Sequence, residues 1–120
     1  MNRYTSLVCS VAFSPNGRFV ASAGDMEEFL KQASVRVWEV ASGQEIHRLK
    51  SHKWPVHSVA FSPDGQLLAS ADTQGSIRLS DVSGGNEVQQ LEASWERISQ
   101  VHSIAFSPDG HLLAAGGQCH

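Results

Sequence analysis

The sequence predicts an all-β protein built from repeated four-stranded antiparallel meander sheets. One phrase occurs three times, as CSVAFSPNGRFVASA, HSVAFSPDGQLLASA and HSIAFSPDGHLLAAG. Its phenylalanines, Phe13, Phe61 and Phe106, are spaced by 48 and 45 residues, and periods of this size indicate repeats that stack on one another. The phrase alternates small or polar residues with large apolar ones and is rich in β-formers, so it favours strands over helices.

The first hairpin of each period is the better defined of the two. Residues 10–13 and 58–61 alternate as half-buried strands do, and each run ends in Ser-Pro-Asn-Gly or Ser-Pro-Asp-Gly. In such a turn Pro presets φ near −65° and Gly tolerates positive φ. The returning strands are rich in Ala and Gly, which suits sheets that pack closely on both faces. They are expected at residues 19–23, 67–71 and 112–116.

A second, less regular hairpin lies between the copies of the phrase. Its strands are expected at residues 35–38, 46–49, 77–80 and 88–91, joined by turns at residues 41–43 and 83–85. Four short strands joined by tight turns make a meander. One such sheet cannot cover both of its apolar faces, so neighbouring copies are expected to stack in a radial or linear array.

These features resemble the repeat pattern of the WD-repeat family. The resemblance rests on VAFSPDG followed by LLASA, on the Trp-acidic pair Trp38-Glu39 and on His52, and it extends over nearly the whole chain. It implies β-propeller blades that serve as a rigid platform for partner proteins, with no intrinsic chemistry. Residues 1–120 are therefore expected to form an incomplete ring, with one blade at 8–50, a second at 51–92 and the first hairpin of a third at 93–120.

The resemblance also implies a hydrogen-bonded set of His, Ser or Thr, Asp and Trp in each blade, whose buried polar groups satisfy one another. The first blade keeps Ser22 and Trp38. Gln32 stands where Asp is expected, and the His position falls near Tyr4. This set is therefore incomplete.

The second blade departs from the pattern at other positions. His52 and Ser70 fit, whereas Gln74 replaces Asp and Ser80 replaces Trp, which leaves Asp81 as the remnant of the Trp-Asp pair. We therefore expect blades that are less rigid than those of consensus repeats, with apolar packing supplying most of the stability.

Composition narrows the classes of partner. Nine Lys and Arg residues against twelve Asp and Glu residues give a net charge of −3, which disfavours nucleic acid as a partner. Two cysteines without a CxxC spacing indicate a reducing compartment. The first residues lack the features of a secretion signal, and no window approaches eighteen consecutive apolar residues. A cytoplasmic protein without membrane contact is expected.

The candidate binding residues lie in loops that the meander brings to one face, opposite the Ser-Pro-Asp-Gly turns. Aromatic side chains on loops of a rigid scaffold are good anchors for a protein interface, and charged neighbours complete such a surface. A competing interpretation of equal weight is that Trp54 and Trp95 fill the junctions between blades. The candidates are Trp54, Trp95, Phe29, Lys53, Arg97 and Glu28.

No catalytic constellation, cofactor or metal is expected. His57 and His102 recur at one repeat position, which indicates a structural role. The serines of the repeated turns are expected to stabilise the turn conformation. The alternative function is a hydrolase or metal-dependent enzyme acting in a propeller channel. We further expect the chain to be a fragment or a truncated reading frame of a longer protein, or else to complete its ring by self-association.

Overall fold

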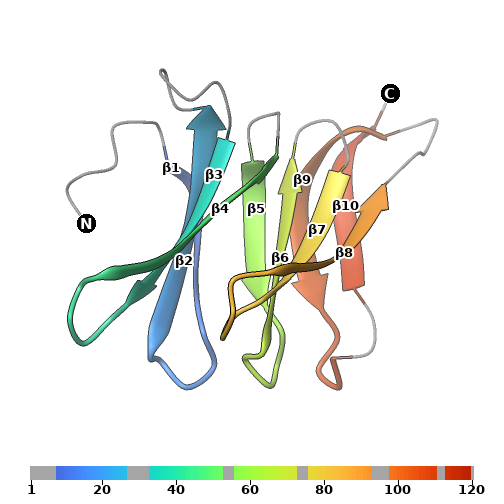
Figure 1. Cartoon of the computed structure of the whole chain (residues 1–120). Helices are drawn as coiled ribbons and strands as arrows, with labels where there is room; N and C mark the ends of the chain where they lie inside the picture. Colours follow the sequence, from blue (N-terminus) through green and yellow to red (C-terminus); the bar gives the residue numbers. More distant parts are fainter. Residues whose placement is uncertain are drawn as a thin grey trace.

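The fold is an array of antiparallel sheets, as predicted. The computed structural model describes residues 8–26, 33–52, 56–72, 76–92, 98–110 and 113–119. Within these ranges ten strands form two four-stranded sheets and one two-stranded sheet, and the three stand side by side in chain order (Figure 1). Every pairing is antiparallel between strands consecutive in the chain. The all-β meander prediction is therefore confirmed.

Each repeat of the sequence phrase forms the first two strands of a sheet. The first sheet consists of β1 (Val8–Phe13), β2 (Phe19–Met26), β3 (Ala33–Glu39) and β4 (Glu45–His52). The second consists of β5 (Val56–Phe61), β6 (Leu67–Asp72), β7 (Ser76–Asp81) and β8 (Glu87–Glu92). The third hairpin consists of β9 (Ile98–Phe106) and β10 (Leu113–Cys119).

The Ser-Pro-Asp-Gly turns are held by their own side chains. In the second sheet the Ser62 hydroxyl donates to Asp64 Oδ1 at 2.6 Å and accepts the Leu67 N–H at 3.0 Å. Asp64 Oδ1 also accepts the Gln66 N–H at 3.0 Å. Gly65 has a φ of 76°, a conformation that other residues adopt only under strain. The first sheet builds the same turn with Asn16 in the place of Asp64, so the geometry does not depend on a charge.

The Asp64 turn is expected to make stability depend on pH. The Ser62 hydroxyl, and then the Gln66 N–H, lower the pKa of the Asp64 carboxyl below its ordinary value of 3.8. A carboxyl whose pKa is lowered by folding stabilises the fold above its unfolded-state pKa, and this contribution disappears as the pH falls through the lowered value.

Denaturant unfolding of the wild type and of Asp64→Asn, at pH values from 7 down to 2, measures this contribution. The wild type is expected to be the more stable at pH 7, and the difference is expected to shrink below about pH 4. Asn16 provides the precedent that the variant can keep the turn. A difference that stays constant over the whole pH range would contradict the assignment.

Small apolar residues let the sheets pack closely on one another. We call the face of each sheet that bears Val11, Val59 or Ile104 its front face, and the opposite face its rear face. The rear face of the first sheet packs on the front face of the second in a cluster of buried residues: Ala21, Ala23, Val35, Val37, Val56, Val59, Leu68 and Val82. The rear face of the second sheet packs on the third hairpin in a second cluster: Ala69, Ala71, Ile77 and Ile104.

A serine at one repeat position links each sheet to the next. Ser10 Oγ on β1 accepts the N–H of Val59 on β5 at 3.3 Å. Ser58 Oγ on β5 accepts the N–H of Ile104 on β9 at 3.0 Å. Because Ser10 and Ser58 occupy equivalent positions in the repeated phrase, the two junctions are built in the same way.

A histidine makes a further link at the outer strands of the first junction. His47 Nε2 on β4 lies 2.7 Å from the carbonyl oxygen of Val82 in the second sheet. Its ring packs so closely on Gly85 that a Cβ there would lie 2.5 Å from His47 Nδ1. Only a glycine fits beneath this ring. The first junction is therefore held between β1 and β5 by Ser10, and between β4 and the turn before β8 by His47.

Candidate functional site

The strands end at two opposite edges of the array. Ala33 pairs with both Met26 and His52, and Val56 pairs with Asp72, so these strand ends lie at one edge, which we call the loop edge. Ser76 and Glu92 extend the loop edge in the second sheet. The five short turns at residues 14–18, 40–44, 62–66, 82–86 and 107–110 lie at the opposite edge, which we call the turn edge (Figure 1).

The candidate binding residues all fall outside the described residues. Their segments, 27–32, 53–55 and 93–97, join strands whose described ends face the loop edge. The prediction for Trp54, Trp95, Phe29, Lys53, Arg97 and Glu28 therefore stays a prediction. What the structure describes is the edge formed by the strand ends that flank these segments.

A buried carboxylate stabilises this edge in the second sheet. Asp72, at the end of β6, is only 2% exposed, and its Oδ1 accepts the N–H of Ser76 at 3.0 Å. This bond ties the last residue of β6 to the first residue of β7. Sequence reasoning looked for an acidic residue at position 74 and found Gln74, so it missed Asp72. The signal was present as an aspartate directly after the buried run of β6.

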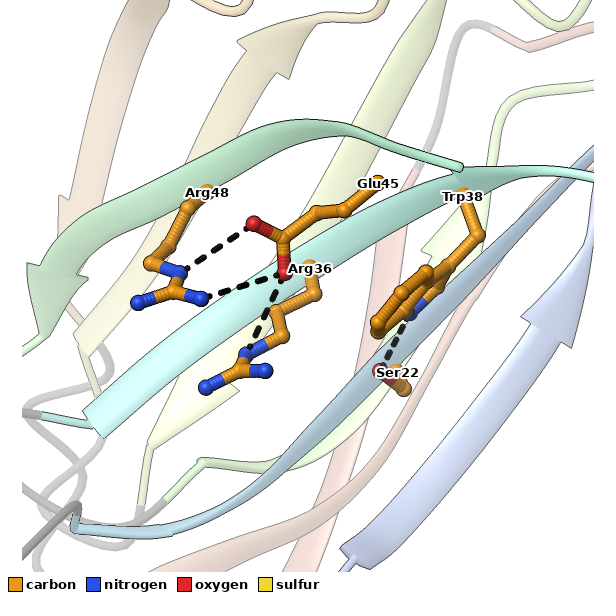
Figure 2. Close-up of polar contacts among 5 residues, drawn as sticks. All are labelled: Ser22, Arg36, Trp38, Glu45 and Arg48. Carbon is orange, nitrogen blue, oxygen red and sulfur yellow. Dashed lines mark hydrogen bonds and ion pairs between the residues drawn. The ribbon is translucent and has the colours of Figure 1, made fainter. Parts of the chain in front are cut away.

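The first sheet pairs a buried indole with a serine. Trp38 Nε1 on β3 donates to Ser22 Oγ on β2 at 3.2 Å, and both residues are buried (Figure 2). These are the two members of the four-residue set that the first repeat retains. The hydrogen bond satisfies the indole N–H, so Trp38 can be buried against the face of the sheet.

A repeated ion pair joins the outer strands, and sequence reasoning did not anticipate it. The buried Arg36 on β3 lies with its Nε 3.5 Å from Glu45 Oε1 on β4, and Arg48 Nε lies 3.3 Å from Glu45 Oε2 (Figure 2). The second sheet repeats the pair, with Arg78 Nη1 2.9 Å from Glu87 Oε1. The equal spacing of the two Arg-Glu pairs along the chain was the signal that could have found them.

The remaining members of the predicted hydrogen-bonded set lie at different places. Ser70 and Ser80 are buried inside the second sheet. Asp81 Oδ1 accepts the N–H of Ser83 at 3.0 Å and its hydroxyl at 2.9 Å, so Asp81 holds the next turn at the turn edge. His52 ends β4 at the loop edge, and its side chain lies outside what is described. Asp81 and His52 therefore belong to opposite edges.

Among the described residues, no group of three or more His, Cys, Asp and Glu side chains is placed to hold a metal ion. The same part of the chain holds no helix that is both long enough and apolar enough to cross a membrane.

Comparison with known proteins gives one result that covers most of the chain. The family model described as WD domain, G-beta repeat matches residues 2–39, 43–81 and 85–120. A comparison with curated proteins finds no significant match. Each matched stretch contains one copy of the phrase. The stretches are offset from the sheets by one strand, because β4 of the first sheet lies in the second stretch and β8 of the second sheet lies in the third.

Proposed function

Because the chain belongs to the WD40-repeat family, we propose that it is a non-catalytic scaffold that binds a partner protein or peptide at its loop edge. WD40 repeats form propellers that typically serve as platforms for protein interaction. The proposal adds to this the edge that is used and the residues that make contact.

The observation that supports the proposal is that the strand ends flanking the candidate segments share one edge. Segments 27–32, 53–55 and 93–97 each connect strands at the loop edge. The turn edge, in contrast, consists of short turns held by internal hydrogen bonds, such as those of Ser62 and Asp64. Loops on a rigid scaffold can present anchors at little cost in conformational entropy, because the scaffold positions them before binding.

Trp54 and Trp95 are the proposed anchors, and charged residues are proposed to border them. Tryptophan is enriched among the residues that dominate interface energies, because it buries a large area with few rotatable bonds. The surrounding contacts are proposed to come from Phe29, Lys53, Arg97 and Glu28. The net charge of −3 supports a protein or peptide partner rather than a nucleic acid, and the sparse cysteines support a cytoplasmic setting.

A peptide selected against the wild-type chain from a displayed random library is the probe for this proposal. Trp54→Ala and Trp95→Ala are each expected to weaken binding of that peptide about tenfold or more, as loss of an interface anchor does. Fluorescence anisotropy of the labelled peptide measures the effect. The matched control is Gln66→Ala at the turn edge, where the exposed Gln66 uses its backbone, and not its side chain, to bond Asp64 and Val82.

Thermal unfolding of the same variants separates binding from packing. Both tryptophan variants are expected to unfold within a few degrees of the wild type. If either variant fails to fold, that tryptophan packs in the junction between blades, and its proposed role as an interface anchor is contradicted. Equal loss of binding in Gln66→Ala would move the interface away from the loop edge.

A further inference from the structure

The first turn of the array carries an asparagine followed by a glycine. The repeated turn reads Ser-Pro-Asn-Gly at residues 14–17 and Ser-Pro-Asp-Gly at residues 62–65 and 107–110, so only the first copy has an amide at the third position. Asparagine before glycine is prone to form a five-membered succinimide ring, because glycine has no side chain to hinder attack by its own backbone nitrogen. Asn16 and Gly17 are therefore a candidate site of spontaneous deamidation.

Two hydrogen-bond donors hold the side-chain carbonyl of Asn16. The Ser14 hydroxyl donates to Asn16 Oδ1 at 2.7 Å, and the Arg18 N–H donates to the same oxygen at 3.0 Å. When the Gly17 nitrogen attacks Asn16 Cγ, negative charge develops on this oxygen. Donors that already point at such an oxygen lower the barrier, as an oxyanion hole does. The turn thus activates the carbon that succinimide formation requires.

The site faces water whether or not a sheet precedes it. Asn16 and Gly17 are exposed, and Asp64, at the position of Asn16 in a turn that does have a preceding sheet, is exposed as well. The Gly17 N–H is donated to the Ser14 carbonyl oxygen at 2.9 Å, and this bond has to open before the nitrogen can attack. Backbone bonds in exposed turns open at low cost. Water and hydroxide can therefore reach the reacting groups.

The turn already accommodates an aspartate at this position. In the second sheet Asp64 Oδ1 accepts the Ser62 hydroxyl at 2.6 Å and the Gln66 N–H at 3.0 Å, which are the two bonds that Asn16 Oδ1 accepts in the first. An aspartate formed from Asn16 can keep both bonds. Isoaspartate would lengthen the main chain by one methylene group within the tight turn and displace the carboxylate from these donors.

We infer that Asn16 deamidates spontaneously in the folded protein, and that the product is aspartate rather than isoaspartate. Hydroxide removes the proton of the Gly17 nitrogen, which then attacks Asn16 Cγ. The intermediate expels the side-chain nitrogen, which takes a proton from water and leaves as ammonia, so that hydroxide is regenerated. The new bond between Cγ and the Gly17 nitrogen closes the succinimide ring.

Water then opens the ring at one of its two carbonyl carbons. Attack at Cγ breaks the new bond, restores the main chain and gives aspartate, whereas attack at the main-chain carbon gives isoaspartate. The donors from Ser14 and Arg18 polarise the Cγ carbonyl and so direct water to that carbon. The net reaction consumes water and releases ammonia. It takes place at the turn edge and does not depend on partner binding at the loop edge.

Incubation of the 120-residue chain at mildly alkaline pH, followed by trypsin digestion at mildly acidic pH and mass spectrometry, tests the inference. Electron-transfer fragmentation of the peptide 4–18 distinguishes aspartate from isoaspartate at position 16. The same chain unfolded in guanidinium chloride is the reference, because a free succinimide opens mainly at the main-chain carbonyl. The ratio of aspartate to isoaspartate is expected to be at least about tenfold higher in the folded chain, as two neutral hydrogen bonds to one transition state allow.

Asp64→Asn provides a matched second site in the same protein. It places asparagine before Gly65, with Ser62 and Gln66 as the donors, so it is expected to deamidate with the same preference for aspartate. Asn86 is the internal control, because it precedes Glu87 and is expected to keep its amide.

Three results would overturn the inference. An Asn16 amide that persists in the folded chain but is lost in the unfolded one would show that the fold protects the site. Equal product ratios in the two states, or mainly isoaspartate at position 64 of folded Asp64→Asn, would show that the donors do not direct the ring opening. Loss of the Asn86 amide as fast as that of Asn16 would show that hydrolysis is unselective.

Discussion

Val59→Asp is expected to unfold the protein, whereas Val11→Asp is expected to leave it folded. The two valines occupy the same position in the repeated phrase, but Val59 is 5% exposed and belongs to the cluster between the first two sheets, whereas Val11 is 60% exposed. A carboxylate at position 59 would be buried without a partner, which costs at least about 4 kcal/mol. That is a large part of the total stability of a small domain, which is about 5–15 kcal/mol.

Circular dichroism during urea unfolding, with both variants at the same concentration, measures this difference. Because the residue replaced, the residue introduced and the strand position are all matched, the comparison isolates the effect of the covering sheet. Equal destabilisation by the two substitutions would mean that the sheets do not stack in solution as they do in the structure.

Trp38→Ala is expected to have the second largest effect, a loss of about 3–5 kcal/mol. Trp38 is 6% exposed and packs on the front face of the first sheet, where it lines an apolar pocket with Phe13 and Val40, so truncation removes the packing that fills this position. Trp38→Phe keeps most of the apolar volume and removes the bond to Ser22, and we expect it to cost about 1 kcal/mol. Ser22→Ala leaves the indole N–H buried without an acceptor and is expected to cost about 1–3 kcal/mol.

A double-mutant cycle of Ser22→Ala and Trp38→Phe measures the bond itself. The double variant is expected to be more stable than the sum of the two single effects predicts, by about 1 kcal/mol, because it leaves no orphaned donor. Additive effects of the two substitutions would show that the 3.2 Å contact contributes nothing to stability.

The strands and turns could be predicted because local signals determine them. The alternation around Phe13, Phe61 and Phe106 specified which residues form strands, and the Ser-Pro-Asp-Gly runs specified where the chain reverses. The side-chain bonds of Ser62 and Asp64 show why this turn signal is strong: the turn residues satisfy one another within a few positions of the chain.

The contacts between sheets could not be predicted in the same way. Whether Ser58 meets Ile104, or His47 meets Val82, depends on how sheets lie relative to one another, and the spacing within one repeat carries no information on that. Asp72 was missed for a related reason. Its position agrees with no expected member of the hydrogen-bonded set, and only its burial and its bond to Ser76 reveal its role. The loop residues proposed to bind a partner depend on the same kind of long-range placement.

The serine links between sheets have a consequence for aggregation. β5 and β9 lie at the edge of their sheets. An unpaired amide on an edge strand can add a foreign strand and begin a fibril. At Val59 and Ile104 this amide is already engaged by a hydroxyl from the adjacent sheet. The bond that fixes one repeat against the next therefore also blocks strand addition at that point.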